Sequence, residues 1–358
     1  MRFLPSVIQA AEKYVSQTGA LVEVVIVDDG STDDTAAWLL EQGFSEKRSV
    51  PDGQCSDSRY EAERARNGET ASEEDAREVP GIARHFIKNG KNIGFGEACN
   101  RGFATATHRL VFLLNNDVEV DSDSIAPLVE CFDDDTVFSV HCRMYELESG
   151  RECGTGKMGG FARGFIRVHQ SYLAKNENAN RTLERKTKPL YSMFAGGGSA
   201  MLDREKFFAI GGFDPLLSPF YWEDVELSYR AWKRGFSILY EPRAMVRHQV
   251  SSTIGKLNRR QVRMIEQRNR LIYHWVNLHD WKMLSSHILW VVLRTLTAPL
   301  RFQPTFVLSV LAALKRLPQI LNRRREERRA AKRTDRNVLE IFDSLQQRDD
   351  VIVYDDQG

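Results

Sequence analysis

The stretch VVIVDDGS, Val24–Ser31, decides the fold of this chain. Its four β-branched residues are typical of a buried strand, and two carboxylates and a glycine end that strand. The helical pattern of residues 32–40 follows directly, with Ser and Thr to cap it and aspartates in its first turn. Carboxylates between a strand and a helix indicate the carboxyl edge of an α/β sheet, where such folds bind their ligands.

The same alternation extends over the N-terminal part of the chain. Helical periodicity in residues 3–17 precedes the strand of 21–27, and strand and helix patterns take turns after it. They are a strand at 83–88, a loop leading into a helix at 92–102, a strand at 110–114, a helix at 125–132 and a strand at 137–143. We therefore expect residues 1–143 to form a doubly wound α/β sheet.

The composition excludes several classes of protein. The 358 residues include 50 Lys and Arg against 49 Asp and Glu, a net charge of +1, which argues against a nucleic-acid binder. Five cysteines without short paired spacings do not suggest a disulfide framework or a zinc site. The N-terminus lacks the apolar run of a secretory signal, so we expect a cytoplasmic protein.

Residues 45–80 interrupt the α/β pattern. Sixteen of these 36 residues are charged, and large apolar side chains are almost absent. Such a segment buries too little surface to offset its ordering entropy, so we predict a disordered insertion. A regulatory or docking loop is the functional alternative.

The second half of the chain changes character. Residues 150–190 are rich in Gly, Arg and Lys and look irregular, and after residue 258 the pattern is helical. No run of 18 apolar residues predicts a spanning helix. Residues 314–336 contain ten basic and three acidic residues beside apolar helices, which favours in-plane attachment to an anionic membrane. The alternative is an ordinary helical subdomain with a solvated, charged tail.

Three acidic signals could carry chemistry. Asp28 and Asp29 could accept hydrogen bonds from a base or ribose, or simply cap the next helix. Asn115-Asn116-Asp117 could bind a hard divalent cation, or form an Asx turn. Glu223 and Asp224 begin a helix that also holds Glu226 and Arg230, so they could supply a general base or serve only as partners of the helix dipole.

Together and in this order, the motifs resemble the family-2 glycosyltransferases of the GT-A fold, with the bacterial rhamnosyltransferase-like branch as the closest match. The resemblance covers about residues 21–250 and continues weakly through Arg268-Asn269-Arg270. It rests on VVIVDDGSTD (24–33), NIGFGEACNRG (92–102), FLLNND (112–117), GGFD (211–214) and WEDVELSYR (222–230).

The resemblance implies a donor site and a metal site. Asp28, Asp29 and Gly30 would lie by the donor nucleoside. Asn92, Gly94 and Asn100 would shape the adjacent loop, and Asn115 and Asn116 would contact the donor. Asp117, at the position of the family's DxD-type motif, would bind Mg²⁺ or Mn²⁺ on the diphosphate, with His248 as a further ligand. Arg230 and Arg268 would contact the diphosphate.

The resemblance also implies the acceptor chemistry. Asp224 would be the general base that deprotonates the acceptor hydroxyl, assisted by Glu223, and Trp222 and Gly197 would line the acceptor site. A cation offsets the charge that develops on a departing diphosphate, and a base with a single displacement inverts the anomeric carbon. The implied protein is a GT-A-type catalytic domain at 1–255 and a helical, basic, possibly membrane-associated tail at 256–358.

The sequence departs from the family pattern at its start. Members open with a central strand, whereas residues 4–15 resemble the helix that follows it, so the first strand is expected to be missing. A late assigned start and a truncated protein are both compatible with this pattern. Asn115 in place of a first aspartate is a milder change.

Three hypotheses follow from these features. The leading one is a metal-dependent inverting glycosyltransferase at the inner face of the cell membrane, acting on a nucleotide sugar and a glycan or lipid-linked acceptor in cell-surface polysaccharide synthesis. The second is a truncated, inactive paralogue that serves as a binding or scaffold protein. The third, a nucleotidyltransferase, is disfavoured by the helix that begins at Trp222-Glu223-Asp224.

Overall fold

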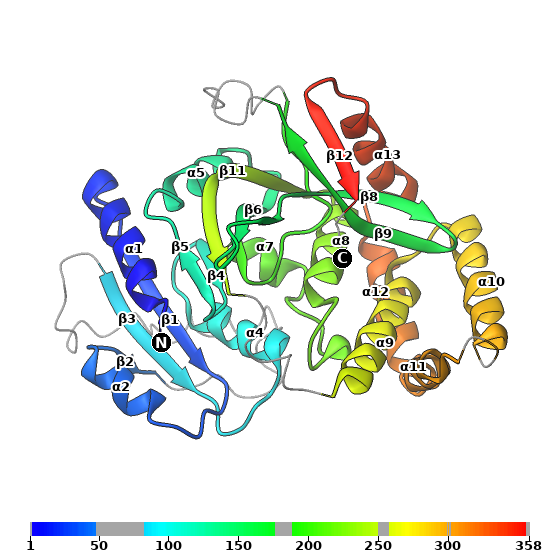
Figure 1. The fold of residues 1–358 in the computed structure, drawn as a ribbon, viewed down its shortest axis with the longest axis horizontal. Coiled ribbons are helices and arrows are strands. Elements are labelled where there is room, and N and C mark those ends of the chain that lie inside the picture. Colours follow the sequence, from blue (N-terminus) through cyan, green and yellow to red (C-terminus); the bar gives the residue numbers. More distant parts are fainter. Residues whose placement is uncertain are drawn as a thin grey trace.

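The computed structural model describes residues 2–47, 82–175, 188–249, 258–298, 300 and 302–355. Most of the predicted insertion at 45–80 lies outside these residues. Its first two residues, Ser45–Glu46, form the short strand β2. Figure 1 shows the fold, with the N-terminal elements on the left and the C-terminal helices on the right.

A small parallel sheet follows the first helix. Helix α1 spans Leu4–Thr18, as the periodicity predicts, and strand β1 spans Val22–Asp28. Strand β3 (Ile82–Lys88) lies between β1 and β2. Helix α2 (Thr35–Glu41) supplies Leu39 to a buried cluster with Phe44 and Phe86 of the sheet. The carboxyl end of β1 therefore carries Asp28 to the sheet edge.

A six-stranded mixed sheet forms the centre of the protein. Its order is β4-β10-β6-β11-β5, with β7 paired to β6. Strands β6 and β11 are parallel, whereas β10 runs antiparallel to both β4 and β6, and β5 antiparallel to β11. The strands are β4 (Leu110–Leu114), β5 (Val118–Val120), β6 (Val137–Glu146), β7 (Glu152–Gly154), β10 (Ser199–Asp203) and β11 (Ser237–His248).

The two sheets share no hydrogen-bonded strand among the described residues. Strand β1 pairs with β3 alone and β4 with β10 alone, and every residue of β4 is half-buried. Residues 2–21 contain α1 and no strand. The absence of a first central strand stays a prediction.

The segment predicted to be irregular contains a third sheet instead. Strands β8 (Gly156–Ala162) and β9 (Phe165–Ala174) form a hairpin, and β12 (Val351–Asp355) pairs with β9. Glycine makes this pairing possible, because a Cβ at Gly156 would stand 2.3 Å from the Tyr172 ring. The region after 258 is therefore not entirely helical: its last described element is a strand.

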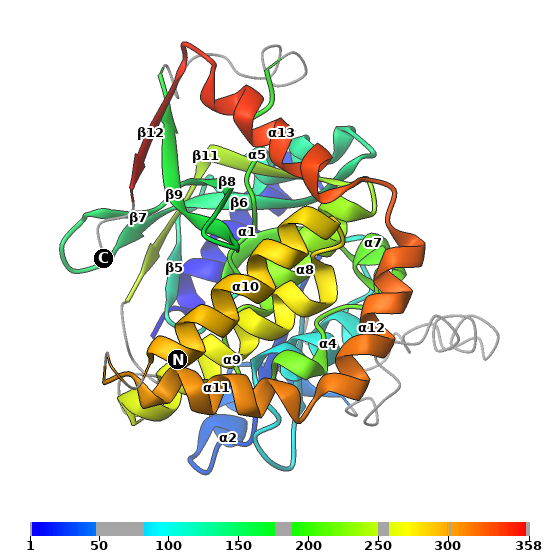
Figure 2. The same ribbon diagram turned by 90° about the vertical axis from the view of Figure 1, so that its right-hand side faces the viewer.

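Helices cover the sheets and form the C-terminal region, as predicted. Figure 2 shows α9–α12 as an outer layer, with α13 above them. Side-chain caps from Asn258, Asp280 and Thr334 begin α9, α10 and α13. The helical segments are α4 (Phe95–Thr105), α5 (Ile125–Val129), η1 (Glu130–Asp133), α7 (Arg204–Ala209), η2 (Pro215–Leu217), α8 (Glu223–Lys233), α9 (Arg259–Asn277), α10 (Trp281–Thr297), α11 (Pro304–Leu314), α12 (Leu317–Ala330) and α13 (Asp335–Gln346).

The main core joins the sheet regions to the C-terminal helices. Phe103, Trp232, Tyr273 and Phe342 belong to one buried cluster although they come from α4, α8, α9 and α13. The predicted boundary at 255 therefore separates two stretches of sequence whose side chains share a core.

Candidate active site

The carboxyl end of β1 presents a buried carboxylate. Asp28 is 4% exposed, and its Oδ1 accepts a hydrogen bond from the Ser31 backbone N–H at 2.8 Å. Its Oδ2 is buried without a hydrogen-bond partner among the described residues. A buried acceptor without a donor destabilises a protein, so this oxygen is suited to accept a donor group from a ligand.

Asp29 holds the neighbouring loop rather than facing outward. Its carboxylate accepts hydrogen bonds from the backbone N–H groups of Ile93, at 3.0 Å, and Gly94, at 3.1 Å. Gly30 has a φ of +85°, and a Cβ there would stand 2.7 Å from the backbone nitrogen of Asn92. Asp29 and Gly30 therefore fix the turn after β1 against the loop, while Asn92 itself is exposed.

Helix α4 connects this loop to a second turn. The Phe95 N–H donates to the Pro219 carbonyl at 3.1 Å, and Gly94 has a φ of +91° at the start of the helix. Asn100 is buried, and both ends of its amide bond the backbone of Phe213, at 3.0 and 2.9 Å. Asn100 therefore ties α4 to the GGFD turn and reaches the loop only through the helix.

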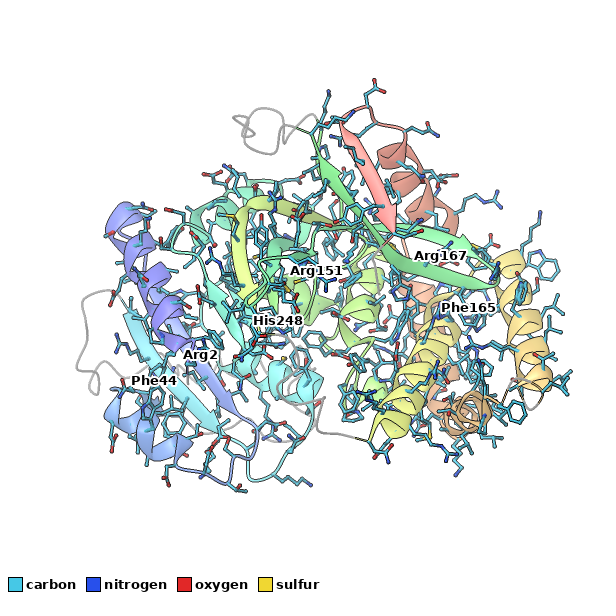
Figure 3. All side chains as sticks on the ribbon, viewed as in Figure 1. Arg2, Phe44, Arg151, Phe165, Arg167 and His248 are labelled. Atoms are coloured by element: carbon cyan, nitrogen blue, oxygen red, sulfur yellow. The ribbon has the colours of Figure 1, made fainter. Side chains whose placement is uncertain are left out.

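The residues predicted to bind metal lie side by side. Strand β11 pairs antiparallel with β5 so that His248 is opposite Val118, next to Asp117. His248 Nε2 and Asp117 Oδ1 are 3.4 Å apart, and Figure 3 shows His248, the last residue of β11, near the centre of the molecule. A carboxylate oxygen and an imidazole nitrogen suit Mn²⁺, and a carboxylate also suits Mg²⁺.

This pair fits a cation that takes its other ligands from a substrate. Among the described residues, no group of three or more His, Cys, Asp or Glu side chains could hold a metal ion. Two protein ligands leave coordination positions for phosphate oxygens, which hard cations prefer. Asn116 is exposed beside Asp117, on the turn that follows β4.

A glycine turn joins the metal-binding side to the acidic helix. The Asn115 N–H donates to the Gly198 carbonyl at 3.1 Å, and a Cβ at Gly198 would stand 2.5 Å from Asn115 Nδ2. The next residue, Gly197, donates its N–H to Asp224 Oδ2 at 3.3 Å. Residues 197–198 therefore contact both Asn115, two residues before Asp117, and Asp224.

The acidic pair begins helix α8. Asp224 is half-buried, and its second oxygen accepts the Val225 N–H at 2.8 Å. Glu223 Oε2 is buried without a hydrogen-bond partner among the described residues. Burial and the neighbouring charge of Asp224 raise the pKa of Glu223 to about 8, and burial raises the pKa of Asp224. Carboxylates with raised pKa values are stronger bases near neutral pH.

A small pocket opens beside this pair. It lies between the start of α4, the short helix η2 and the loop that follows η2. Its lining residues are Gly96, Glu97, Asp214, Pro215, Leu217, Ser218, Pro219 and Glu223. Because Glu223 is part of the lining, a molecule in the pocket would lie next to the acidic pair.

Two predicted site residues, Trp222 and Arg230, are packed into the core. Trp222 is 6% exposed, and its ring centroid lies 5.4 Å from that of Tyr273. Arg230 is fully buried, and it bonds Glu226 and the carbonyl oxygens of Ile210 and Gly212 through all three nitrogens. Arg230 would have to leave the core to reach a diphosphate, so the structure gives it the role of anchoring α8.

Arg268 lies closer to the pocket. It donates to the Ser218 carbonyl at 2.6 Å and to Asn269 Oδ1 at 2.8 Å. Burial and the nearby Arg316 lower its pKa to about 10, so the guanidinium remains charged at neutral pH. Its contact with Ser218 positions one wall of the pocket.

Three residues that the sequence did not single out support the site. Asn89 donates to Asp29 at 2.9 Å and accepts from Arg101 at 2.7 Å. His141 accepts the Gly196 N–H at 3.3 Å, and burial lowers its pKa to about 3, so the ring is neutral. Phe95, which lies within the quoted 92–102 motif, packs against Gly197. Asn89 directly follows β3 and His141 lies within β6, and the sequence pattern gives no signal for a functional residue at either position.

A comparison with known protein families identifies the family of this chain. A family model described as glycosyltransferase-like family 2 matches residues 65–267, more than half of the chain. The chain belongs to this family. The match includes β4, the Asp117–His248 pair, the glycine turn and all of α8. The predicted fold class, a GT-A-type mixed α/β sheet with a C-terminal helical region, is confirmed.

Curated relatives of this family-2 chain are named N-acetylgalactosaminyltransferases. A putative polypeptide N-acetylgalactosaminyltransferase 13 of Drosophila melanogaster is 28% identical over 46% of this chain and 29% of its own length. N-acetylgalactosaminyltransferase 7 of Homo sapiens is 37% identical over 19% of this chain and 10% of its own. The chain thus spans less than a third of the relatives it matches. The rhamnosyltransferase-like branch stays a prediction.

Solved structures of similar chains include GalNAc-T7 and TarS. The structure of GalNAc-T7 with UDP, GalNAc and Mn²⁺ has a TM-score of 0.44 and 19% identity, over 74% of this chain and 49% of that one. Staphylococcus aureus TarS 1–349 in complex with UDP-GlcNAc has a TM-score of 0.46 and 14% identity, over 100% of this chain and 93% of that one.

Proposed function

We propose that this chain transfers a sugar from a nucleotide-diphosphate donor to an acceptor hydroxyl, with inversion at the anomeric carbon. One observation carries the proposal: residues 197–198 contact both Asn115, beside the Asp117–His248 pair, and Asp224. A group that binds a diphosphate and a group that takes a proton are thereby held at one sheet edge.

One group of residues would bind the donor. Asp28 accepts a hydrogen bond from the nucleoside through its unpaired Oδ2. Asp117 and His248 would hold Mg²⁺ or Mn²⁺, which when bound neutralises charge on the departing diphosphate. Asp29 and Asn100 position the loop and helix beside the donor through their backbone contacts.

The transfer itself requires one proton to move. The acceptor hydroxyl oxygen forms a bond to the anomeric carbon while the bond from that carbon to the diphosphate oxygen breaks, and the hydroxyl proton goes to Asp224. The Gly197 N–H holds one oxygen of Asp224 in place. Glu223, with a pKa near 8, retains a proton at neutral pH and so adds no second negative charge beside Asp224.

The identities of the donor sugar and of the acceptor are proposed separately. The names of the curated relatives favour an N-acetylhexosamine donor, and the motif resemblance favours rhamnose. The acceptor is a glycan or a lipid-linked glycan, and polysaccharide synthesis is the process that such transfers serve.

The test compares metal-dependent donor use across variants of the full chain. Transfer or donor hydrolysis is measured with Mn²⁺ over a panel of nucleotide-linked N-acetylhexosamines, hexoses and rhamnose. Asp117→Asn and His248→Ala should each reduce activity at least tenfold and weaken Mn²⁺-dependent nucleotide binding. Glu119→Gln is the matched control, since Glu119 is a nearby carboxylate that pairs with Arg247 and not with the Asp117–His248 pair. Full activity in both site variants would refute the assignment, and no nucleotide binding by the wild type would favour an inactive binding protein.

A further inference from the structure

The outer faces of α10, α11 and the start of α12, together with Leu300 and Phe302 between α10 and α11, form an extended apolar surface. Its most exposed members are Phe302, at 92%, Leu300, at 81%, Trp281, at 73%, and Leu296, at 70%. The other exposed apolar residues of this surface are Ile288, Leu289, Trp290, Val292, Leu293, Leu308, Leu311, Leu314, Leu317 and Leu321. So much apolar exposure in one region marks an interaction surface.

The opposite faces of the same helices are buried. Val291 of α10, Phe306 and Val310 of α11 and Ile320 of α12 share one cluster with α9. Phe165 of β9 packs against both His274 of α9 and His287 of α10, with ring centroids 5.1 and 4.8 Å apart, and Figure 3 shows it at this end of the molecule. The surface is therefore held in a fixed shape by the fold.

The charges around this surface are mostly positive, although Glu326 of α12 is also exposed. The sequence contains no Asp or Glu from Trp281 to Arg325. Lys282, Lys315, Arg325, Arg328 and Arg329 are exposed at the ends of these helices. Apolar side chains flanked by cations suit an anionic membrane. The apolar side chains can contact the acyl chains, and the cations can contact the phosphate headgroups.

We propose that this surface binds in the plane of an anionic lipid bilayer, with its apolar side chains at the acyl boundary and its cations among the phosphates. Figure 2 shows α10, α11 and α12 on one side of the molecule, as such binding requires. Among the described residues, no single helix is long and apolar enough to cross a membrane. Only α11 and α12 taken together, with a bend of 68° between them, reach that length and apolar composition.

The surface lies close to the candidate acceptor pocket. Leu217 lines that pocket beside Glu223 and also belongs to the buried cluster with Phe306, Val310 and Ile320. The wall of the pocket therefore belongs to the same core as the helices that carry the apolar surface. If the proposed transfer is correct, this placement selects a lipid-linked acceptor presented from the bilayer.

The test is flotation of the full chain with vesicles of phosphatidylcholine alone or with 30 mol% phosphatidylglycerol (about one lipid in three). We expect binding at least tenfold stronger to the anionic vesicles, and weaker binding as salt is raised. Leu296→Glu with Phe302→Glu should reduce binding at least tenfold. Leu21→Glu, an equally exposed leucine outside this surface at 74%, should leave binding unchanged.

A charge variant separates lipid binding from self-association. Lys315→Gln with Arg328→Gln and Arg329→Gln should lower anionic-vesicle binding about fivefold per cation removed. Equal binding to neutral and anionic vesicles, no binding at low salt, or a dimer in sedimentation that Leu296→Glu dissociates would each overturn the proposal. Flotation needs no catalysis, so a failure of sugar transfer leaves this result interpretable, and the reverse also holds.

Discussion

Glu223→Gln should stabilise the protein, and by an amount that depends on pH. The Glu223 carboxyl is buried beside Asp224, and its Oε2 has no hydrogen-bond partner among the described residues. Burial and the charge of Asp224 therefore raise its pKa from 4.5 to about 8. Glutamine keeps the shape of the side chain and never ionises, so the variant removes the cost of burying this charge.

The sign and size follow from the two pKa values. In the unfolded chain the carboxyl loses its proton above pH 4.5, while in the folded protein it keeps the proton up to about pH 8. The folded state therefore loses stability relative to the unfolded chain as pH rises, by about 1.4 kcal/mol per pH unit across this window. The gain from glutamine should be near zero at pH 4, about 3 kcal/mol at pH 7 and up to about 5 kcal/mol at pH 9.

Urea unfolding of the wild type and the variant at pH 5, 7 and 9 measures this difference. The same measurement on Glu119→Gln, which removes an exposed charge paired with Arg247, is the control and should vary little with pH. A difference for Glu223→Gln that stays flat from pH 5 to 9 would refute the raised pKa. So would a difference that shrinks as pH rises.

Three further predictions concern the site and its support. Asp224→Asn should lower kcat by about 10²–10⁴ while leaving the KM for the donor nearly unchanged, because it removes the base and keeps the shape; steady-state kinetics measure both. Gly198→Ala should reduce activity at least tenfold, since its Cβ would stand 2.5 Å from Asn115 Nδ2, whereas Gly160→Ala meets no atom within 4 Å and should be neutral. Arg230→Leu should cost about 3–5 kcal/mol in thermal or urea unfolding, because it leaves the buried Glu226 carboxylate without its cation. A double variant that adds Glu226→Gln should recover part of this loss.

Most of the fold could be predicted from local sequence patterns. The helix α1, the strand β1 and the helix α8 follow from periodicity and turn glycines within short windows. The third sheet did not follow, because glycine-rich sequence looks irregular until its partner is known. Gly156 is a strand residue only because Tyr172 covers it across the hairpin.

The site was less accessible to sequence reasoning than the fold. The residue types at positions 117 and 248 were identified, but their 3.4 Å separation depends on the register of β11 against β5, which the sequence does not encode locally. Arg230 lies four residues after Glu226, the spacing of a helix ion pair, and only burial decides that it anchors the helix instead of contacting a ligand. The apolar sequence of α10 and α11 likewise does not reveal which of its side chains are in the core. Only the structure shows that many of them are exposed.

Helix α8 explains why the C-terminal region belongs to the catalytic unit. The helix dipole at its start favours ionised carboxylates, whereas burial opposes them, so small movements of α8 would change the proton affinity of the acidic pair. Its position is fixed from the C-terminal side: Asp335 of α13 accepts hydrogen bonds from Tyr229 at 2.7 Å and Lys233 at 2.6 Å. The same carboxylate accepts the backbone N–H groups of His279 and Asp280, which join α9 to α10. One buried aspartate thus connects the helix of the acidic pair to the helices that carry the apolar surface. The pKa values of the acidic pair and the proposed membrane binding of that surface therefore depend on the same packing.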